Sequence, residues 1–257
     1  MIHNYQIIIE YQGTHFHGWQ YQKNGISIQE ILEKKLKKLL RKKIRMIGAG
    51  RTDAGVHATG QSANFLLDKK IENKKFFLNS INFFLKKYSI SIIDIKKKKL
   101  NFHSRYDAKE RLYNYRIINR YGALALNTNR AWLIKSEIDI YLLKKGAKIL
   151  EGKHDFSTFR ASSCSSKSPV KKINSIKVSK KGNEILIQFK SQSFLQNQVR
   201  SMVGSLEHLS CGKWTFNNFK KIFKSKKRSR CAPPAPAFRL PTCPRCSVPA
   251  ADSPSAS

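Results

Sequence analysis

Apolar and polar residues alternate at the start of the chain, and the spacing then becomes helical. Residues 5–11 alternate as a half-buried strand does. Ser27 followed by Glu30 matches a capping box, and the apolar stripe after it predicts a helix. The same patterns predict strands at 44–47, 61–67 and 90–95 and a second helix at 74–87. The order β-α-β-β-α-β is that of a ferredoxin-like unit.

A second unit of the same kind begins near residue 111, where 111–119 alternates as a strand. The pattern then predicts a helix at 137–150 introduced by Ser136, a hairpin of 173–178 and 184–190, a helix at 194–209 and another from Thr215. The closing strand of this unit is missing. The predicted fold class is α+β, with two ferredoxin-like halves that share a continuous, mainly antiparallel sheet and form a central cleft.

These patterns divide the chain into an N-terminal half (1–104), a C-terminal half (105–237) and an atypical tail (238–257). The end of the chain differs in composition, since 229–257 hold seven of the eight prolines and three of the five cysteines. We expect the tail to be disordered or foreign to the rest of the chain. Cys243 and Cys246 have the spacing of half a zinc site, but a second pair is lacking, so no metal is predicted.

The charge of the chain favours a polyanionic partner. Its 50 Lys and Arg against 16 Asp and Glu leave a net charge of +34. Cations near phosphates release condensed counterions, which favours a nucleic acid, although AT-rich codons could also account for many of the lysines. No stretch is apolar enough for a membrane span, and the N-terminus lacks a signal-peptide core. We therefore expect a soluble cytoplasmic protein.

The segment GAGRTDAGVHATGQ, residues 48–61, is the densest in candidate chemistry. A charged, glycine-rich loop between two strands allows a ligand to approach the backbone closely. It lacks the Gly-Lys-Ser/Thr of a phosphate-binding Walker loop. From the residues alone, Asp53 is as compatible with a turn as with catalysis, and His57 with a turn or packing role.

This loop resembles the signature of tRNA pseudouridine synthases of the TruA type. Other segments resemble the same family in the same order: YQGTHFHGWQYQ (11–22), SIQEILEKKL (27–36), FHSRYDAKERLYNYRI (102–117), EGKHDFSTFRAS (151–162) and SFLQNQVRSMVGSL (193–206). The resemblance covers about residues 3–230. It implies the pseudouridine synthase fold and the isomerisation of uridine to pseudouridine at positions 38, 39 and 40 of the anticodon stem-loop of tRNA. It also implies a homodimer.

The resemblance assigns roles to individual residues. Asp53 matches the essential carboxylate, acting as nucleophile or general base, and Arg200 the arginine that pairs with it. A buried carboxylate stays ionised when a cation holds its pKa down, which is the role expected of Arg200. Tyr113 matches the tyrosine that stacks on the flipped-out base. Arg51 is expected to contact RNA or displace the base, and Arg105 and Arg111 to meet phosphates. The reaction needs no cofactor and no metal.

The resemblance departs from the family at two places. Gln196 and Asn197 stand where the family usually has histidines. After Ala235-Pro236-Ala237, the prolines Pro241 and Pro244 are incompatible with the family's closing strand. Two alternatives therefore remain open: a catalytically impaired RNA-binding protein of the same fold, and a basic ribosome-associated structural protein.

Overall fold

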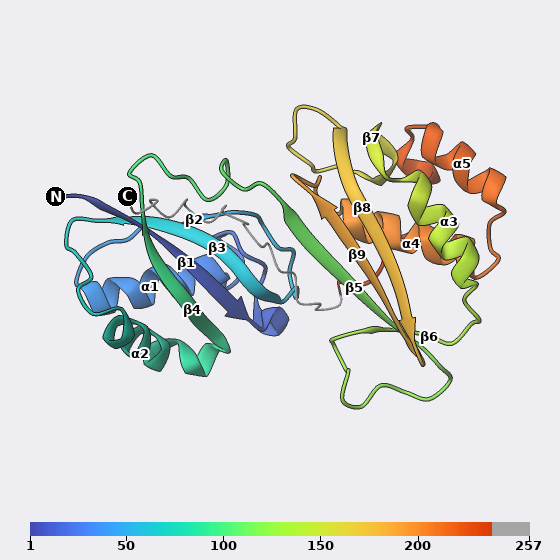
Figure 1. Ribbon diagram of the computed structural model, residues 1–257. Coiled ribbons are helices and arrows are strands. Elements are labelled where there is room, and N and C mark those ends of the chain that lie inside the picture. Colours follow the sequence, from blue (N-terminus) through green and yellow to red (C-terminus); the bar gives the residue numbers. More distant parts are fainter. Residues whose placement is uncertain (238–257) are drawn as a thin grey trace, which may run out of the picture.

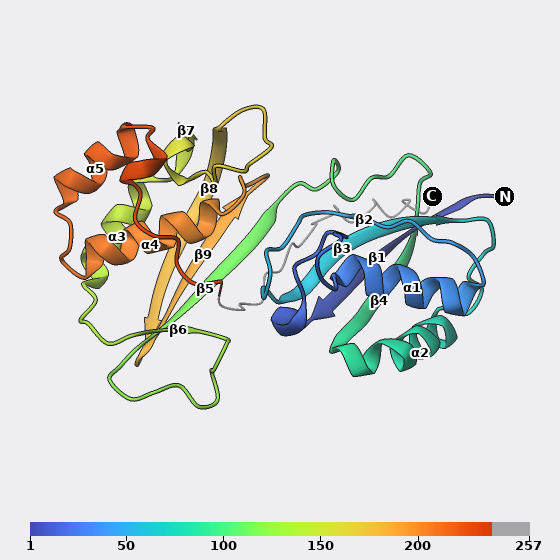
Figure 2. The same cartoon turned by 180° about the vertical axis from the view of Figure 1, so that it is seen from behind.

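The computed structural model describes residues 1–237 as two sheets, each with its helices on one face (Figures 1 and 2). The strand order is β2-β3-β1-β4 in the first sheet and β6-β5-β9-β8-β7 in the second. In Figure 2, the helices of both halves lie in front of their sheets. The tail at 238–257 and the missing closing strand lie outside the described residues.

The first sheet is antiparallel throughout. Its half contains β1 His3–Tyr11, α1 Ile28–Leu40, β2 Ile47–Gly48, β3 Ala58–Leu67, α2 Lys74–Leu85 and β4 Ile90–Lys98. The capping box is confirmed, since the Ser27 hydroxyl accepts a hydrogen bond from the Glu30 N–H at 3.2 Å. Most of the strand predicted at 44–47 is wrong, because β2 begins only at Ile47 and contains two residues.

The second sheet is antiparallel except where β5 pairs with β6. Its half contains β5 Arg111–Asn119, β6 Trp132–Ile134, α3 Ile140–Ile149, β7 Gly152–Asp155, β8 Val170–Lys181, β9 Glu184–Ser191, α4 Gln198–Ser210 and α5 Phe216–Lys224. Ser136 does not cap α3, because the Asp139 carboxylate accepts the hydrogen bond from the Leu142 N–H. The fourth helix begins at Gln198 rather than at 194.

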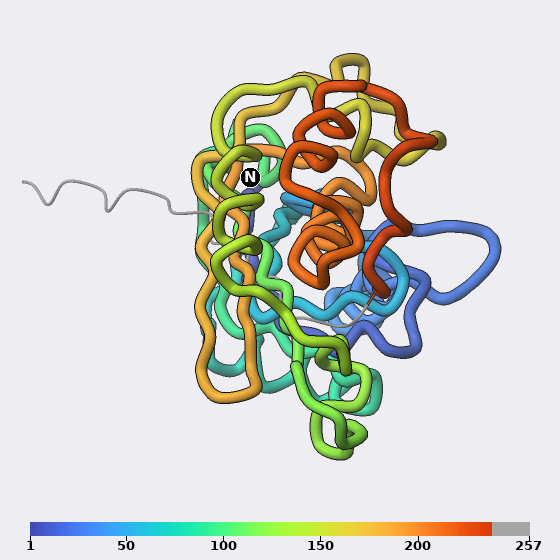
Figure 3. The backbone as a smooth tube through the Cα atoms, turned by 90° about the vertical axis from the view of Figure 1, so that its right-hand side faces the viewer, coloured from blue at the N-terminus to red at the C-terminus, as the bar shows by residue number. Residues whose placement is uncertain are grey.

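The two halves have separate hydrophobic cores. One core contains apolar side chains from Tyr5 to Ile95, and the other contains apolar side chains from Tyr115 to Ala235. The side-on view of Figure 3 shows the two halves one behind the other. The α+β fold class with its central cleft is confirmed.

In one detail the prediction was wrong: the described strands form two sheets instead of one continuous sheet. The reason lies at the junction of the halves, where side chains rather than paired strands make the contact. Arg111 Nε donates a hydrogen bond to the Ala49 carbonyl at 3.1 Å, and the Tyr113 hydroxyl lies 3.5 Å from the Arg51 carbonyl. The start of β5 therefore meets the loop after β2 through its side chains.

Candidate active site

A cleft of about 960 Å³ lies between the two halves. One wall is formed by residues 17–22 and the loop after β2, and the other by β5 and residues 193–200. Its charged lining is strongly unbalanced: among the described residues, Asp53 is the single carboxylate, and the cations are Arg45, Arg51, Arg105, Arg111, Lys171 and Arg200. Such a lining attracts a polyanion and places it beside one carboxylate.

The loop that carries Asp53 is fastened to the segment that follows β1. Thr52 is fixed twice, since its hydroxyl is 2.9 Å from the Tyr11 hydroxyl and its carbonyl accepts from the Trp19 N–H at 3.1 Å. A Cβ atom at Gly18 would lie 2.5 Å from the Thr52 carbonyl oxygen, so this close approach requires glycine. The segments 11–22 and 48–61 are therefore held together by these contacts.

The turn after Asp53 exposes its carboxylate to the cleft. The Val56 N–H donates to the Asp53 carbonyl at 3.2 Å, and Gly55 adopts φ 79°, a conformation that side chains disfavour. His57 lies at the base of this loop, where its Nδ1 accepts from the Gly13 N–H at 3.2 Å. Its Nε2 lies 3.3 Å from the Asn129 carbonyl of the second half. His57 therefore supports the loop, in line with the packing alternative.

Asp53 and Arg200 form an ion pair across the cleft, with 3.7 Å between Oδ2 and Nη1. Both side chains are partly accessible, Asp53 to 37% and Arg200 to 26%. Burial raises the pKa of Asp53 above its ordinary value, and the charge and hydrogen bonding of Arg200 oppose that rise. Arg200 therefore acts on the pKa of Asp53 in the direction expected of it, although the effect of burial is larger.

Three protein groups contact the Arg200 guanidinium: one backbone carbonyl, one side-chain amide and the Asp53 carboxylate. Its Nε donates to the Ala235 carbonyl at 2.8 Å, and its Nη1 lies 3.3 Å from Asn197 Oδ1 in addition to Asp53. Asn197 adopts φ 59° at the start of α4, a conformation that Asn tolerates better than most residues. The sequence marks Asn197 as a departure from the family and Ala235 as part of a family segment, but it did not reveal the contact of either residue with Arg200.

Tyr113 shares the cleft with Asp53 and Arg200. Its ring packs edge-on against Phe194, with centroids 5.0 Å apart and planes at 76°. Burial and the nearby Asp53 charge raise the pKa of Tyr113 to about 12, so the phenol keeps its proton at neutral pH. The structure thus brings together the three residues on which the sequence hypothesis depends.

The three other arginines predicted to contact RNA also line the cleft, but they differ in their contacts. Arg51 Nε donates to Gln20 Oε1 at 3.2 Å, and Arg105 lies over the exposed ring of Tyr106. Arg111 is bound to backbone carbonyls of both halves, at Ala49, Arg105 and Gln192. Its guanidinium is therefore engaged in joining the halves.

A family model described as tRNA pseudouridine synthase matches residues 7–107 and 147–243. The chain belongs to this family. The stretch between the two matched segments carries Arg111 and Tyr113.

Curated relatives cover nearly the whole chain, and each is named tRNA pseudouridine synthase A. The protein of Pelagibacter ubique (strain HTCC1062) is 54% identical over 236 residues, which are 92% of this chain and 96% of the relative. That of Ehrlichia canis (strain Jake) is 44% identical over 239 residues, with 92% and 96% covered. That of Paramagnetospirillum magneticum (strain ATCC 700264 / AMB-1) is 41% identical over 236 residues, with 92% of each covered.

Two further observations concern the described part of this synthase. No helix in residues 1–237 is long and apolar enough to cross a bilayer. Within the same residues, no group of three or more His, Cys, Asp or Glu side chains is placed to hold a metal ion.

Proposed function

We infer that this protein isomerises uridine to pseudouridine in tRNA, and we propose positions 38, 39 and 40 of the anticodon stem-loop as its targets. Membership of the tRNA pseudouridine synthase family supports the activity. The observation that carries the mechanism is the cleft, which the described residues line with six cations and one carboxylate. RNA is a polyanion, and the chemistry requires one ionised carboxylate at the nucleoside.

Asp53 is the proposed catalytic carboxylate. The reaction breaks the N1–C1′ bond of uridine and joins C1′ to C5, while the C5 proton is lost and N1 gains one. Asp53 could attack the ribose, attack the base or remove a ribose proton, and each route uses its ionised form. Its accessible position at the cleft surface supports this role, because a nucleoside must reach the carboxylate.

Arg200 and Tyr113 are the proposed partners of Asp53. The guanidinium charge favours the ionised carboxylate against the effect of burial. Removing a uridine from its stack costs a few kcal/mol, and stacking on an aromatic ring offsets about 1–3 kcal/mol. The ring of Tyr113 is half-buried in the cleft, where such a base would lie.

Arg51, Arg105 and Arg111 are proposed to contact the RNA. Arg51 lies two residues before Asp53 and lines the cleft, which supports a role in displacing the target base. The exposed Arg105 is suited to a phosphate. We expect the weakest RNA contribution from Arg111, since backbone carbonyls of both halves already bind it.

We further propose the division into halves at 1–104 and 105–237, a homodimeric state and a cytoplasmic location. The separate hydrophobic cores support the division. The dimer rests on the family resemblance. The location is supported by the proposed tRNA substrate.

Release of tritium from tRNA labelled at uridine C5 tests the activity, because rearrangement to a C5–C1′ bond expels that hydrogen. We expect release with the wild-type protein and at least about 1,000-fold slower release with Asp53→Asn, since an amide cannot act as nucleophile or base. Asp68→Asn is the matched control, because Asp68 is an exposed aspartate paired with Lys42 and does not line the cleft.

Three outcomes contradict the proposal. Equal release by wild type and Asp53→Asn removes Asp53 from catalysis. Tight tRNA binding without release by the wild type favours the catalytically impaired relative, and stoichiometric ribosome binding without turnover favours the structural protein.

A further inference from the structure

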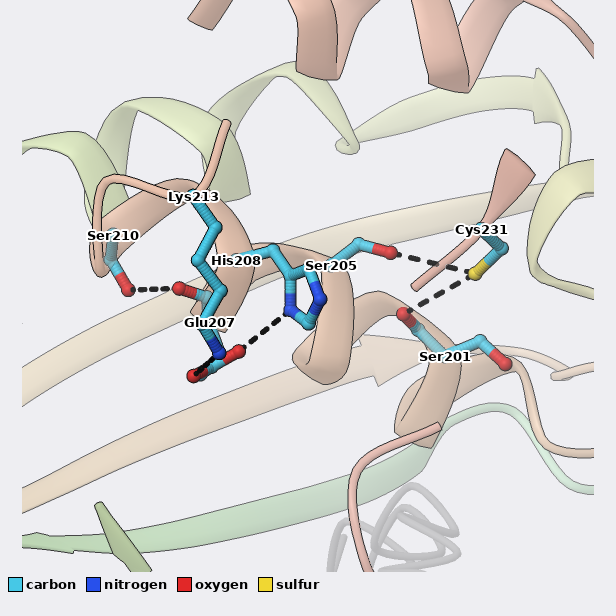
Figure 4. A network of polar contacts seen from close by, with 7 residues as sticks. All are labelled: Ser201, Ser205, Glu207, His208, Ser210, Lys213 and Cys231. Atoms are coloured by element: carbon cyan, nitrogen blue, oxygen red, sulfur yellow. Dashed lines mark hydrogen bonds and ion pairs between the residues drawn. The ribbon is translucent and has the colours of Figure 1, made fainter. Parts of the chain in front are cut away.

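The segment 231–237 lies along α4 and reaches the candidate active site. Figure 4 shows its first residue, Cys231, beside two serines of α4: the thiol is 3.5 Å from the Ser205 hydroxyl and 3.8 Å from the Ser201 carbonyl. A Cβ atom at Gly204 would lie 2.1 Å from the Pro233 carbonyl oxygen, so the helix admits this backbone because it has glycine there. The segment is therefore packed against α4 at successive points.

Ala235 is bound to Arg200 by two hydrogen bonds in opposite directions. The Ala235 N–H donates to the Arg200 carbonyl at 2.9 Å, and Arg200 Nε donates to the Ala235 carbonyl at 2.8 Å. A guanidinium is planar, so a fixed acceptor at Nε also limits the direction of the Nη1 and Nη2 groups. The backbone at Ala235 thereby orients the group that faces Asp53.

Tyr115 holds the residue next to Ala235. Its hydroxyl donates to the Pro236 carbonyl at 2.8 Å, and its side chain is buried in the core of the second half, with 4% of the residue exposed. Burial raises the pKa of Tyr115, which keeps the phenol protonated as a donor. Because Ala235 precedes a proline, its backbone is already restricted to extended conformations.

We propose that Tyr115 is a positioning residue for Arg200 and acts through the backbone of residues 235–236. The phenol fixes the Pro236 carbonyl, the neighbouring Ala235 carbonyl fixes Arg200 Nε, and Nη1 is thereby directed to Asp53. This inference rests on the proposed function, because the role of Arg200 beside Asp53 is part of it.

A buried tyrosine hydroxyl commonly forms a hydrogen bond for stability alone. Tyr5 provides the comparison: it is also 4% exposed, and its hydroxyl accepts from the Ile71 N–H at 2.8 Å in the first half. Tyr5 does not line the cleft. The Tyr5→Phe variant is therefore a control for the loss of one buried hydroxyl hydrogen bond.

The test measures single-turnover tritium release from saturating C5-labelled tRNA across a range of pH. With Tyr115→Phe we expect a rate about 10-fold lower, because a small misplacement of a catalytic group is costly, with unchanged tRNA affinity. The acid limb of the pH profile, where the rate falls as the pH is lowered, should move to higher pH. A misdirected Arg200 opposes the raised pKa of Asp53 less well. Tyr5→Phe should lower the melting temperature at most and leave rate and pH profile unchanged.

A double-mutant cycle with Arg200→Lys tests whether Tyr115 acts through Arg200. The effect of Tyr115→Phe should largely disappear in the Arg200→Lys background, since the lysine lacks the Nε contact with Ala235. An undiminished effect in that background, or a Tyr115→Phe profile equal to that of Tyr5→Phe, overturns the inference.

Pro236→Ala provides a second variant, which keeps the carbonyl acceptor but frees the backbone. We expect the same direction of change with a smaller size, and no change in the acid limb would count against the proposal. Failure of the proposed function has a different signature: wild type releases no tritium, or Arg200→Lys has no effect by itself.

Discussion

Asp53 and Glu207 each have a cationic partner, but the surroundings of the two carboxylates are opposite. Asp53 faces Arg200 across 3.7 Å at the surface of a cleft, with 37% of its side chain accessible. Glu207 on α4 is 7% accessible and is bound by Lys213 at 2.8 Å and by His208 Nδ1 at 2.7 Å (Figure 4). The attraction between opposite charges thus forms a solvent-accessible pair at Asp53 and a cluster around a buried carboxylate at Glu207.

The difference teaches how a reactive carboxylate can be distinguished from a structural one. The oxygens of Glu207 are occupied by hydrogen bonds within the protein, so they stabilise the junction after α4. Asp53 has a more distant partner and a cleft in front of it, and burial raises its pKa. A raised pKa beside a specific charge in a cleft is typical of functional groups.

The largest difference should follow from removing the cation of each pair. With Arg200→Gln we expect tritium release to fall about 100-fold, because Asp53 loses the charge that favours its ionised form, as when a preorganised group is removed from an active site. With Lys213→Gln, tritium release should stay within about 2-fold, since Lys213 does not line the cleft. Equal losses of activity would contradict the distinction between the two pairs.

The next largest effect should come from Glu207→Gln. Its amide cannot neutralise Lys213, so we expect the free energy of unfolding to fall by about 2 kcal/mol, less than for a fully buried pair because Lys213 is half exposed. Urea unfolding measures the loss. Tritium release at a temperature where the variant is folded should equal that of the wild type, and an unchanged unfolding midpoint would show that the cluster has no structural role.

The smallest effect should appear in the pH profile. Asp53 acts in its ionised form, and burial raises its pKa. When the pH is lowered, activity should therefore begin to decline above the ordinary aspartate pKa of about 3.9. Arg200→Lys keeps a positive charge and should shift this limb upward less than Arg200→Gln does. If activity declines at the same pH in the wild type, Arg200→Lys and Arg200→Gln, the ion pair does not control the protonation that matters for catalysis.

Local sequence signals predicted the long elements of the fold. Ser27 and Thr215 each cap the helix that their pattern indicated, and 111–119 is a strand with the predicted bounds. The short strands β6 and β7 were missed because three or four residues give too little periodicity. Ser136 was predicted to introduce the helix that Asp139 caps, because both residue types are suited to a helix N-terminus and the predicted helix began three residues too early.

The site required more than local patterns. Composition left Asp53 ambiguous between a turn and a catalytic residue, and the family resemblance directed attention to Arg200 and Tyr113. The contacts of Ala235 and Asn197 with Arg200 were not foreseen. The Ala235 contact depends on a carbonyl oxygen, and every residue has one, so no residue type reveals it.

The Asp53–Arg200 pair joins groups from different halves of the chain. During synthesis, the proposed carboxylate leaves the ribosome well before its guanidinium, and the Ala235 carbonyl that orients the guanidinium follows later still. A nascent chain with a finished first half therefore holds its aspartate without the opposite wall. The proposed site is therefore complete only after the chain has been synthesised as far as Ala235.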